Sequence, residues 1–110
     1  MSKFLVLLPL VGAAFAAGTP YEVTVRPFLR ENCAPCHNAK FASGDLNIER
    51  LAAEDAADSL KERSRWENMI RRMRAGEMPP KNAKRPAEPQ ISAVADWVEA
   101  EYARLDRETQ

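Results

Sequence analysis

Two cysteines and the only histidine of the chain lie within one short motif, Cys33-Ala34-Pro35-Cys36-His37. Two thiols separated by two residues can each bond to one of the two vinyl groups on an edge of haem. The adjacent imidazole can then reach the iron from the same side. Because C-x-x-C-H is the attachment signature of c-type haem, the sequence predicts one haem c, covalently bound through Cys33 and Cys36, with His37 as an axial iron ligand.

Three other uses of the motif are weaker. A thioredoxin-like redox pair belongs beside a βαβ pattern, and the sequence has no period-2 strand pattern. A zinc site would need a fourth ligand, and the chain holds no further cysteine or histidine, although an acidic ligand remains open. A disulfide between Cys33 and Cys36 would close a very short loop and stabilise little.

A second axial ligand is expected among three methionines. Met69 and Met73 lie on the apolar stripe of an expected helix, where methionine is more often a core residue. Met78 follows the end of that helix and precedes Pro79 and Pro80, which restrict the backbone. We therefore predict Met78 as the distal ligand, with Met73 as the second choice.

The first residues have the pattern of an export signal. Lys3 provides a positive charge, residues 4–15 form an apolar run, and Ala14-Phe15-Ala16 is typical of a cleavage site. We predict a signal peptide at residues 1–16 and one domain at residues 17–110, located in the periplasm or otherwise exported. The alternative is an uncleaved anchor, but the run is short for a membrane span, and we expect none in the mature chain.

Charge is balanced overall but unevenly distributed. The chain has 16 basic and 16 acidic residues, so no general attraction to nucleic acid is expected. Residues 61–85 nevertheless hold nine basic residues and three acidic ones. A solvated helix face is the simpler explanation of such a run. The excess also suggests a docking surface for an acidic redox partner. The basic residues of this segment are Lys61, Arg63, Arg65, Arg71, Arg72, Arg74, Lys81, Lys84 and Arg85.

The apolar spacing predicts an all-α chain of about three to five helices. One short helix should begin near Arg26 and run into the cysteine motif, and an alanine-rich helix is expected over residues 51–60 after a loop at residues 38–50. Ser64 and Glu67 form the pattern of a capping box for a third helix that Gly76 ends. Four prolines predict an extended loop over residues 77–89.

The last helix should start near Pro89. Its apolar stripe continues to Leu105, and Trp97 is expected in the core. For Trp66 we leave two roles open, a core side chain or a donor to a haem propionate.

The chain resembles the small class I cytochromes c, and most closely the planctomycete-type cytochrome c-like modules. This resemblance covers nearly all of residues 17–110 and implies a cytochrome c-like fold around one haem, axial ligation by His37 and Met78, and electron transfer. Its motifs are Val25-Arg26-Pro27-Phe28-Leu29, the Cys33 to His37 motif, Gly44-Asp45-Leu46, the Trp66 helix with Met78-Pro79-Pro80, and Trp97-Val98.

Two departures from mitochondrial-type cytochromes affect these expectations. Residues 21–32 contain no glycine where the last helix crosses the first, so the crossing must differ. No proline follows His37 closely, so a carbonyl of residues 38–47 is expected to accept from the imidazole Nδ1.

The predicted function is that of a monomeric electron carrier, not an enzyme. Ligation by His37 and Met78 would close both axial positions of the iron. The thioether would raise the reduction potential of the iron relative to ligation by two histidines. Two alternatives remain, a haem domain of a larger oxidoreductase and a haem sensor or enzyme with a labile distal ligand. The latter would lack a second histidine for distal acid-base chemistry.

Overall fold

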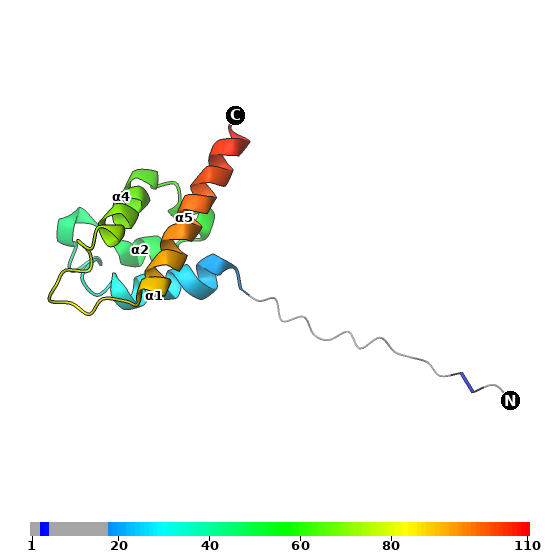
Figure 1. Cartoon of the computed structure of the whole chain (residues 1–110), viewed down its shortest axis with the longest axis horizontal. Helices are drawn as coiled ribbons and strands as arrows, with labels where there is room; N and C mark the ends of the chain where they lie inside the picture. Colours follow the sequence, from blue (N-terminus) through cyan, green and yellow to red (C-terminus); the bar gives the residue numbers. More distant parts are fainter. Residues whose placement is uncertain (1–2, 5–17) are drawn as a thin grey trace.

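The computed structural model describes residues 3–4 and 18–110, and in these residues the chain is all-α (Figure 1). The predicted all-α class is confirmed, and the described part contains no strand beyond an isolated bridge between His37 and Ala42. The predicted signal peptide lies outside the described residues except for Lys3 and Phe4. The five α-helices are α1 (Arg26–Asn32), α2 (Ile48–Ala53), α3 (Ala56–Ser59), α4 (Arg63–Arg74) and α5 (Glu88–Glu108).

A π-helical turn, η1 (Tyr21–Val25), leads directly into α1. The change from the wider turn to the regular helix occurs beside Pro27, which has no N–H to donate and is accepted in a first turn. The predicted start near Arg26 is therefore confirmed. At the other end the N–H of Cys33 donates to the carbonyl of Leu29 at 3.0 Å, so the helix continues into the cysteine motif.

The expected helix at residues 51–60 is wrong in its bounds, because the segment forms two helices. The first, α2, begins at Ile48, and the side chain of Asn47 accepts the N–H of Arg50. Glu54 and Asp55 are extended, and the Asp55 side chain caps α3.

Contacts from η1 and α1 explain the break after α2. Tyr21 Oη donates to the carbonyls of Leu51 at 2.9 Å and Glu54 at 3.1 Å. Arg26 donates to the carbonyls of Ala52 and Glu54. These carbonyls at the end of α2 are satisfied by another segment of the chain, so the helix ends there without a glycine cap.

The predicted capping box of α4 is wrong. The helix begins at Arg63, two residues before the start that a cap at Ser64 predicts, so Ser64 lies inside the first turn and no side chain caps the helix. The carboxylate of Glu67 pairs instead with Arg63. The start is set by Trp66, whose buried indole Nε1 donates to the Ser59 carbonyl at 2.9 Å and thereby fixes the turn between α3 and α4.

The end of α4 agrees with the prediction. Gly76 has a positive φ of 74°, the N–H of Gly76 donates to the Met73 carbonyl, and the N–H of Glu77 donates to the Arg72 carbonyl. This pair of bonds is a Schellman motif, which favours glycine at that position. The predicted proline-rich loop occupies residues 77–87, and α5 then starts at Glu88 with Pro89 in its first turn.

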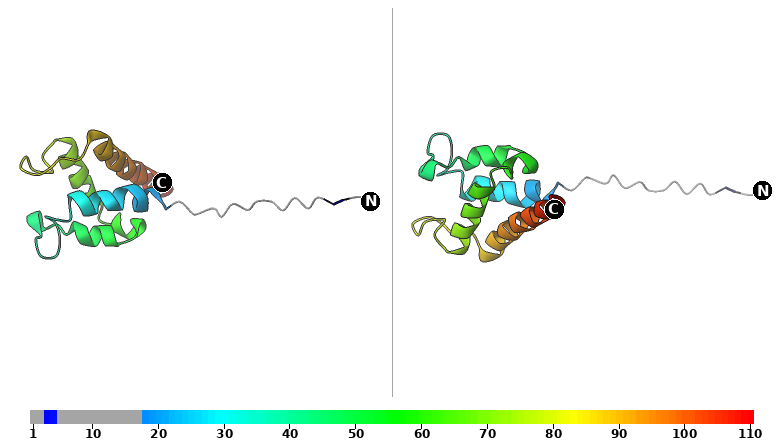
Figure 2. Two further views of the ribbon diagram at one scale, coloured as in Figure 1. Left: turned by 90° about the horizontal axis from the view of Figure 1, so that it is seen from below. Right: turned by 90° about the horizontal axis from the view of Figure 1, so that it is seen from above.

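The helices enclose one apolar core in which α5 packs on α4 and η1 and α1 packs on α2 (Figure 2). At the contact of η1 with α5 the ring centroids of Tyr21 and Trp97 lie 5.5 Å apart. Two aromatic side chains therefore fill the contact between the first and last helical segments, where a glycine would let the two backbones come closer. The buried apolar residues are Tyr21, Val25, Phe28, Leu29, Ile48, Leu51, Ala52, Leu60, Trp66, Met69, Ile70, Met73, Ile91, Val94, Ala95, Val98 and Tyr102, with Trp97 and Leu105 partly buried against them.

Candidate functional site

The cysteine motif forms a compact turn at the end of α1. The carbonyl of Cys33 accepts the N–H groups of Cys36 at 3.2 Å and His37 at 3.0 Å. Cys33 is partly buried and packs against the core, whereas Cys36 is exposed. One thiol therefore faces the core and the other faces solvent, and His37 follows in the same turn.

The environment of Cys33 does not favour a redox thiol pair. Burial, with a smaller contribution from the neighbouring Cys36, raises the pKa of Cys33 to about 12. Reactive C-x-x-C pairs have a thiol whose pKa is lowered, because the thiolate is the nucleophile. A protonated, partly buried thiol at this position argues against thioredoxin-like chemistry.

His37 is buried, with 8% of its surface exposed, and its Nδ1 has no hydrogen-bond partner among the described residues. The expected carbonyl acceptor within residues 38–47 is therefore absent, and that prediction is wrong. The backbone of His37 is well anchored, since its carbonyl accepts the N–H groups of Ile48 at 2.8 Å and Glu49 at 3.1 Å. Leaving a buried polar atom unpaired costs about 1–3 kcal/mol, and no hydrogen bond within the described residues orients the Nδ1 of this imidazole.

Asn38 holds the motif and the following turn together, a role that the sequence analysis missed. Its Nδ2 donates to the carbonyls of Ala34 at 2.7 Å and Pro35 at 3.2 Å. Its Oδ1 accepts the N–H groups of Lys40 and Phe41. Asparagine is a typical turn residue, so its position directly after the motif could have predicted this role.

Met78 is half-buried, and both of its backbone polar groups are bonded. Its N–H donates to the Arg72 carbonyl at 3.3 Å, and its carbonyl accepts from Arg85 Nη1 at 3.1 Å. Met69 and Met73 instead lie in the core, as their places on the helix stripe predict. The hydrogen bond from Arg85 to the Met78 carbonyl could not be predicted from the sequence, because only the tertiary structure brings these two residues together.

The structure brings Cys33, Cys36 and His37 together in one turn, and Met78 comes from a separate loop. In every view the loop at residues 38–47 and the loop at residues 77–87 extend from the same end of the helical domain (Figures 1 and 2). Two surface hollows lie elsewhere, one between α4 and α5 and one between α1 and α5, and neither is lined by the four predicted site residues. The described residues contain no cluster of three or more His, Cys, Asp or Glu side chains that could hold a metal ion.

Trp66 is a core residue. It is fully buried, and its only donor is used by the carbonyl and hydroxyl of Ser59, at 2.9 and 3.2 Å. Of the two roles left open for this side chain, the structure supports packing.

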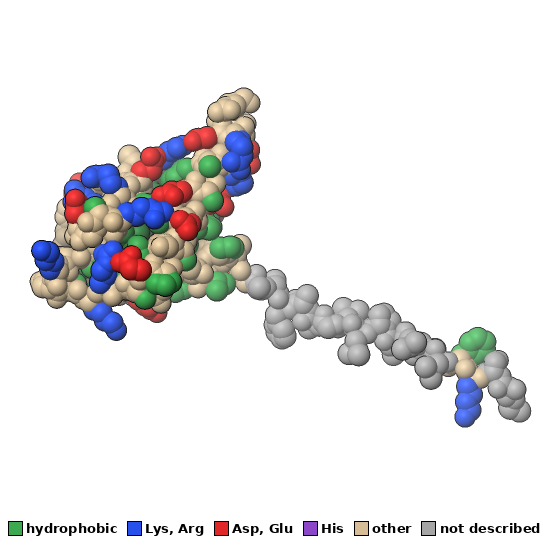
Figure 3. Space-filling model, in the orientation of Figure 1, with side chains coloured by type: hydrophobic (Ala, Val, Ile, Leu, Met, Phe, Trp, Pro, Cys, Tyr) green, Lys and Arg blue, Asp and Glu red, His purple; other side chains and the backbone are tan. Residues whose placement is uncertain are grey.

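Most of the basic residues at 61–85 are paired. Arg74 contacts Asp96 and Glu99, and Arg63 contacts Asp106, so blue and red side chains alternate over the face formed by α4 and α5 (Figure 3). In the described part of the chain only Arg71, Lys81 and Lys84 of this segment lack a carboxylate partner.

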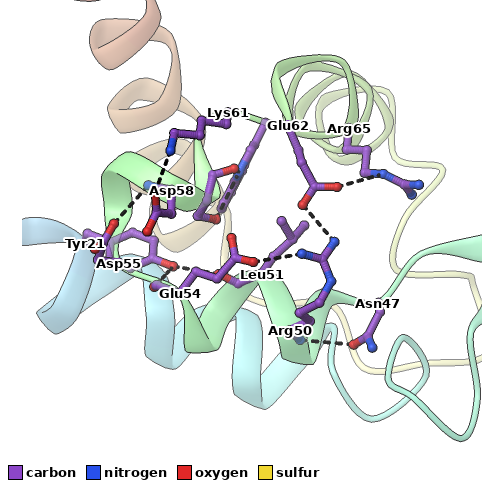
Figure 4. Close-up of polar contacts among 12 residues, drawn as sticks. Tyr21, Asn47, Arg50, Leu51, Glu54, Asp55, Asp58, Lys61, Glu62 and Arg65 are labelled. Atoms are coloured by element: carbon purple, nitrogen blue, oxygen red, sulfur yellow. Dashed lines mark hydrogen bonds and ion pairs between the residues drawn. The ribbon is translucent and has the colours of Figure 1, made fainter.

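A chain of ion pairs also joins α2 to the start of α4. Arg50 contacts Glu54 and Glu62, each at 2.8 Å, and Glu62 also contacts Arg65 (Figure 4). Arg65 Nη1 then donates to the carbonyl of Asp45 at 3.0 Å. These contacts fasten the loop after His37 to α4, and they leave few of these charges free.

No helix within residues 18–110 combines the length and the apolar character needed to cross a bilayer. The comparisons with known proteins identify no family: no family model, no curated protein and no solved structure matches this chain.

Proposed function

We propose that the chain is an exported c-type cytochrome that carries single electrons through one covalently bound haem. The observation that carries the proposal is the C-x-x-C-H turn at the end of α1, in which the buried His37 directly follows the two thiols. Resemblance to the class I cytochromes c supports the same interpretation. When bound, haem would supply a one-electron iron couple.

The donor set fits this cofactor. Each thiol of Cys33 and Cys36 would add its S–H across one vinyl C=C, with sulfur bonding one carbon and hydrogen the other, so no oxidant or reductant is consumed. The imidazole of His37 and the thioether of Met78 are ligand types that iron accepts in this class. His37 would bind from the segment that carries the thioethers, and Met78 from the loop at residues 77–87.

The protein would contribute rigid placement of both ligands. The His37 carbonyl is tied to the start of α2, and Asn38 clamps the carbonyls of the motif. Met78 is held through both its N–H and its carbonyl. An electron carrier needs no open position for substrate, and two anchored ligands suit that requirement better than a labile distal site.

The proposal also includes docking to an acidic partner, through fewer basic residues than the nine that residues 61–85 contain. Arg85 is engaged by Met78 and Glu88, and most arginines of α4 pair with carboxylates. Lys81 and Lys84 lie on the same loop as Met78 and have no ion pair within the described residues. They are the charges that we propose would meet a partner.

Mass spectrometry of the purified chain tests the cofactor. Co-expression with cytochrome c maturation factors should add the mass of one haem, which should remain after denaturation. The variants Cys33→Ala and Cys36→Ala should each retain at most one thioether, and the chain made without the maturation factors is the control. An unmodified mass in their presence would refute covalent haem binding.

A further inference from the structure

Arg85 connects three segments of the protein beside Met78. Its Nη1 donates to the Met78 carbonyl at 3.1 Å, and its Nη2 donates to the Met73 carbonyl at 2.9 Å. Its Nε donates to the Glu88 carboxylate at 3.0 Å. One guanidinium thus joins the loop at residues 77–87 to the last turn of α4 and the first turn of α5.

The chemistry of arginine suits this position. The planar guanidinium presents several N–H groups in a fixed fork, so it can serve three acceptors at once. The Met73 carbonyl lies at the C-terminal end of α4, where the helix dipole favours a positive charge. Glu88 supplies the counter-charge and orients the fork. A lysine would carry the same charge but could not reproduce this geometry.

We propose that Arg85 is the positioning residue that keeps the Met78 thioether at the iron and so limits access of other ligands to the distal position. This inference rests on the proposed function, because it requires Met78 to be a ligand. Arg85 would act through the Met78 carbonyl, seven residues away in sequence, and would not touch the iron.

The expected effect follows from a two-state loop. When Met78 is bound, the distal position is closed, and an added ligand binds only to the fraction of molecules in which the loop has released it. The apparent affinity of the added ligand equals its intrinsic affinity multiplied by that fraction. Weakening the Arg85 contacts should raise the open fraction, and therefore the apparent affinity, by the same factor.

The experiment is a titration of the ferric holoprotein with imidazole, followed by loss of the sulfur-to-iron charge-transfer band. Arg85→Lys and Arg85→Gln should each bind imidazole about tenfold more tightly than the parent, the effect expected from losing charge-assisted hydrogen bonds. Glu88→Gln should give a smaller change, roughly threefold, because one bond of the fork is weakened. If Arg85→Gln does not fold, Arg85→Lys and Glu88→Gln still decide the question.

Two controls separate positioning from charge and from stability. Lys84→Gln removes a neighbouring positive charge of the same loop and should leave imidazole affinity within about twofold. Tyr102→Phe removes a buried hydrogen bond to the Leu60 carbonyl, far along α5. It should lower the free energy of unfolding without changing imidazole affinity.

The outcomes distinguish this inference from the proposed function. A parent protein with covalent haem but no sulfur-to-iron band would refute Met78 ligation and this inference with it. A parent with that band, but with unchanged imidazole affinity in the Arg85 variants, would refute the role of Arg85 alone. An equal change in Tyr102→Phe would likewise refute it, since general destabilisation would then explain the effect.

Discussion

Asn38 Nδ2 donates to the carbonyl of Ala34 at 2.7 Å, so the residue after the C-x-x-C-H motif holds the backbone inside it. The same side chain also reaches Pro35, Lys40 and Phe41. One amide therefore joins the end of α1 to the loop that leads to α2. The position of His37 depends on these hydrogen bonds of Asn38 as well as on the bonds from its own carbonyl to the start of α2.

We predict that Asn38→Ala lowers the free energy of unfolding by about 1–3 kcal/mol, because partly buried backbone groups lose their partners. Urea denaturation of the holoprotein measures this. Asn82→Ala is the matched control, since Asn82 is exposed and its side chain makes no hydrogen bond within the described residues. Equal stability of the two variants would show that the Asn38 contacts contribute nothing.

Two methionine variants test the distal ligand. Met78→Ala should abolish the sulfur-to-iron band of the ferric protein and lower the reduction potential, because a weaker ligand would replace the thioether. Met73→Ala should keep the band but cost about 2–5 kcal/mol of stability, because Met73 is 4% exposed in the core. Absorption spectra and urea denaturation separate these results. The opposite pattern would assign the ligand to Met73.

Tyr102 should make the protein less stable at high pH. Burial raises the pKa of Tyr102 to about 12, and its hydroxyl donates to the Leu60 carbonyl. In the unfolded chain tyrosine has a pKa of about 10. The native state therefore binds the proton more tightly, and its stabilisation is complete below about pH 10 and is lost as pH rises toward about 12.

The measurement is the free energy of unfolding at pH 8 and pH 11, compared between the parent and Tyr102→Phe. The parent should lose about 1 kcal/mol more than the variant over this interval, because only the parent must ionise this buried phenol on unfolding. Other groups titrate equally in both proteins and cancel. Parallel losses would show that the Tyr102 phenol is not protected in the folded state.

Electron transfer to an acidic partner should depend on Lys81 and Lys84. The bimolecular rate should fall with rising salt, since exposed charges are screened over about 8 Å at physiological ionic strength. Reversing both charges, Lys81→Glu with Lys84→Glu, should flatten this dependence. The control pair is Arg104→Glu with Arg107→Glu at the C-terminal end of α5. Stopped-flow rates that are equally sensitive to salt in both double variants would exclude docking at the Met78 loop.

The sequence alone was sufficient for the features that depend on local rules. Helical spacing identified the buried stripe of α4 and of α5, because an amphipathic helix must turn one face to the core. Gly76 and Pro89 marked the end of one helix and the start of the next, because each residue has a strong backbone preference. The C-x-x-C-H motif was likewise visible, since its chemistry resides in adjacent residues.

Other features were decided by contacts between distant residues. The break after α2 arises because Tyr21 and Arg26 satisfy its last carbonyls, and no local signal at Glu54 reports them. The start of α4 follows from the bond of Trp66 to Ser59, which overrode the capping pattern.

The surroundings of the two predicted axial ligands also required the tertiary structure. The sequence could select His37 and Met78 by residue type and position. It could not show that the His37 Nδ1 is buried without a partner, or that Arg85 bonds to the Met78 carbonyl. The motif is a property of adjacent residues, whereas burial and hydrogen bonding depend on which segments the folded core brings together.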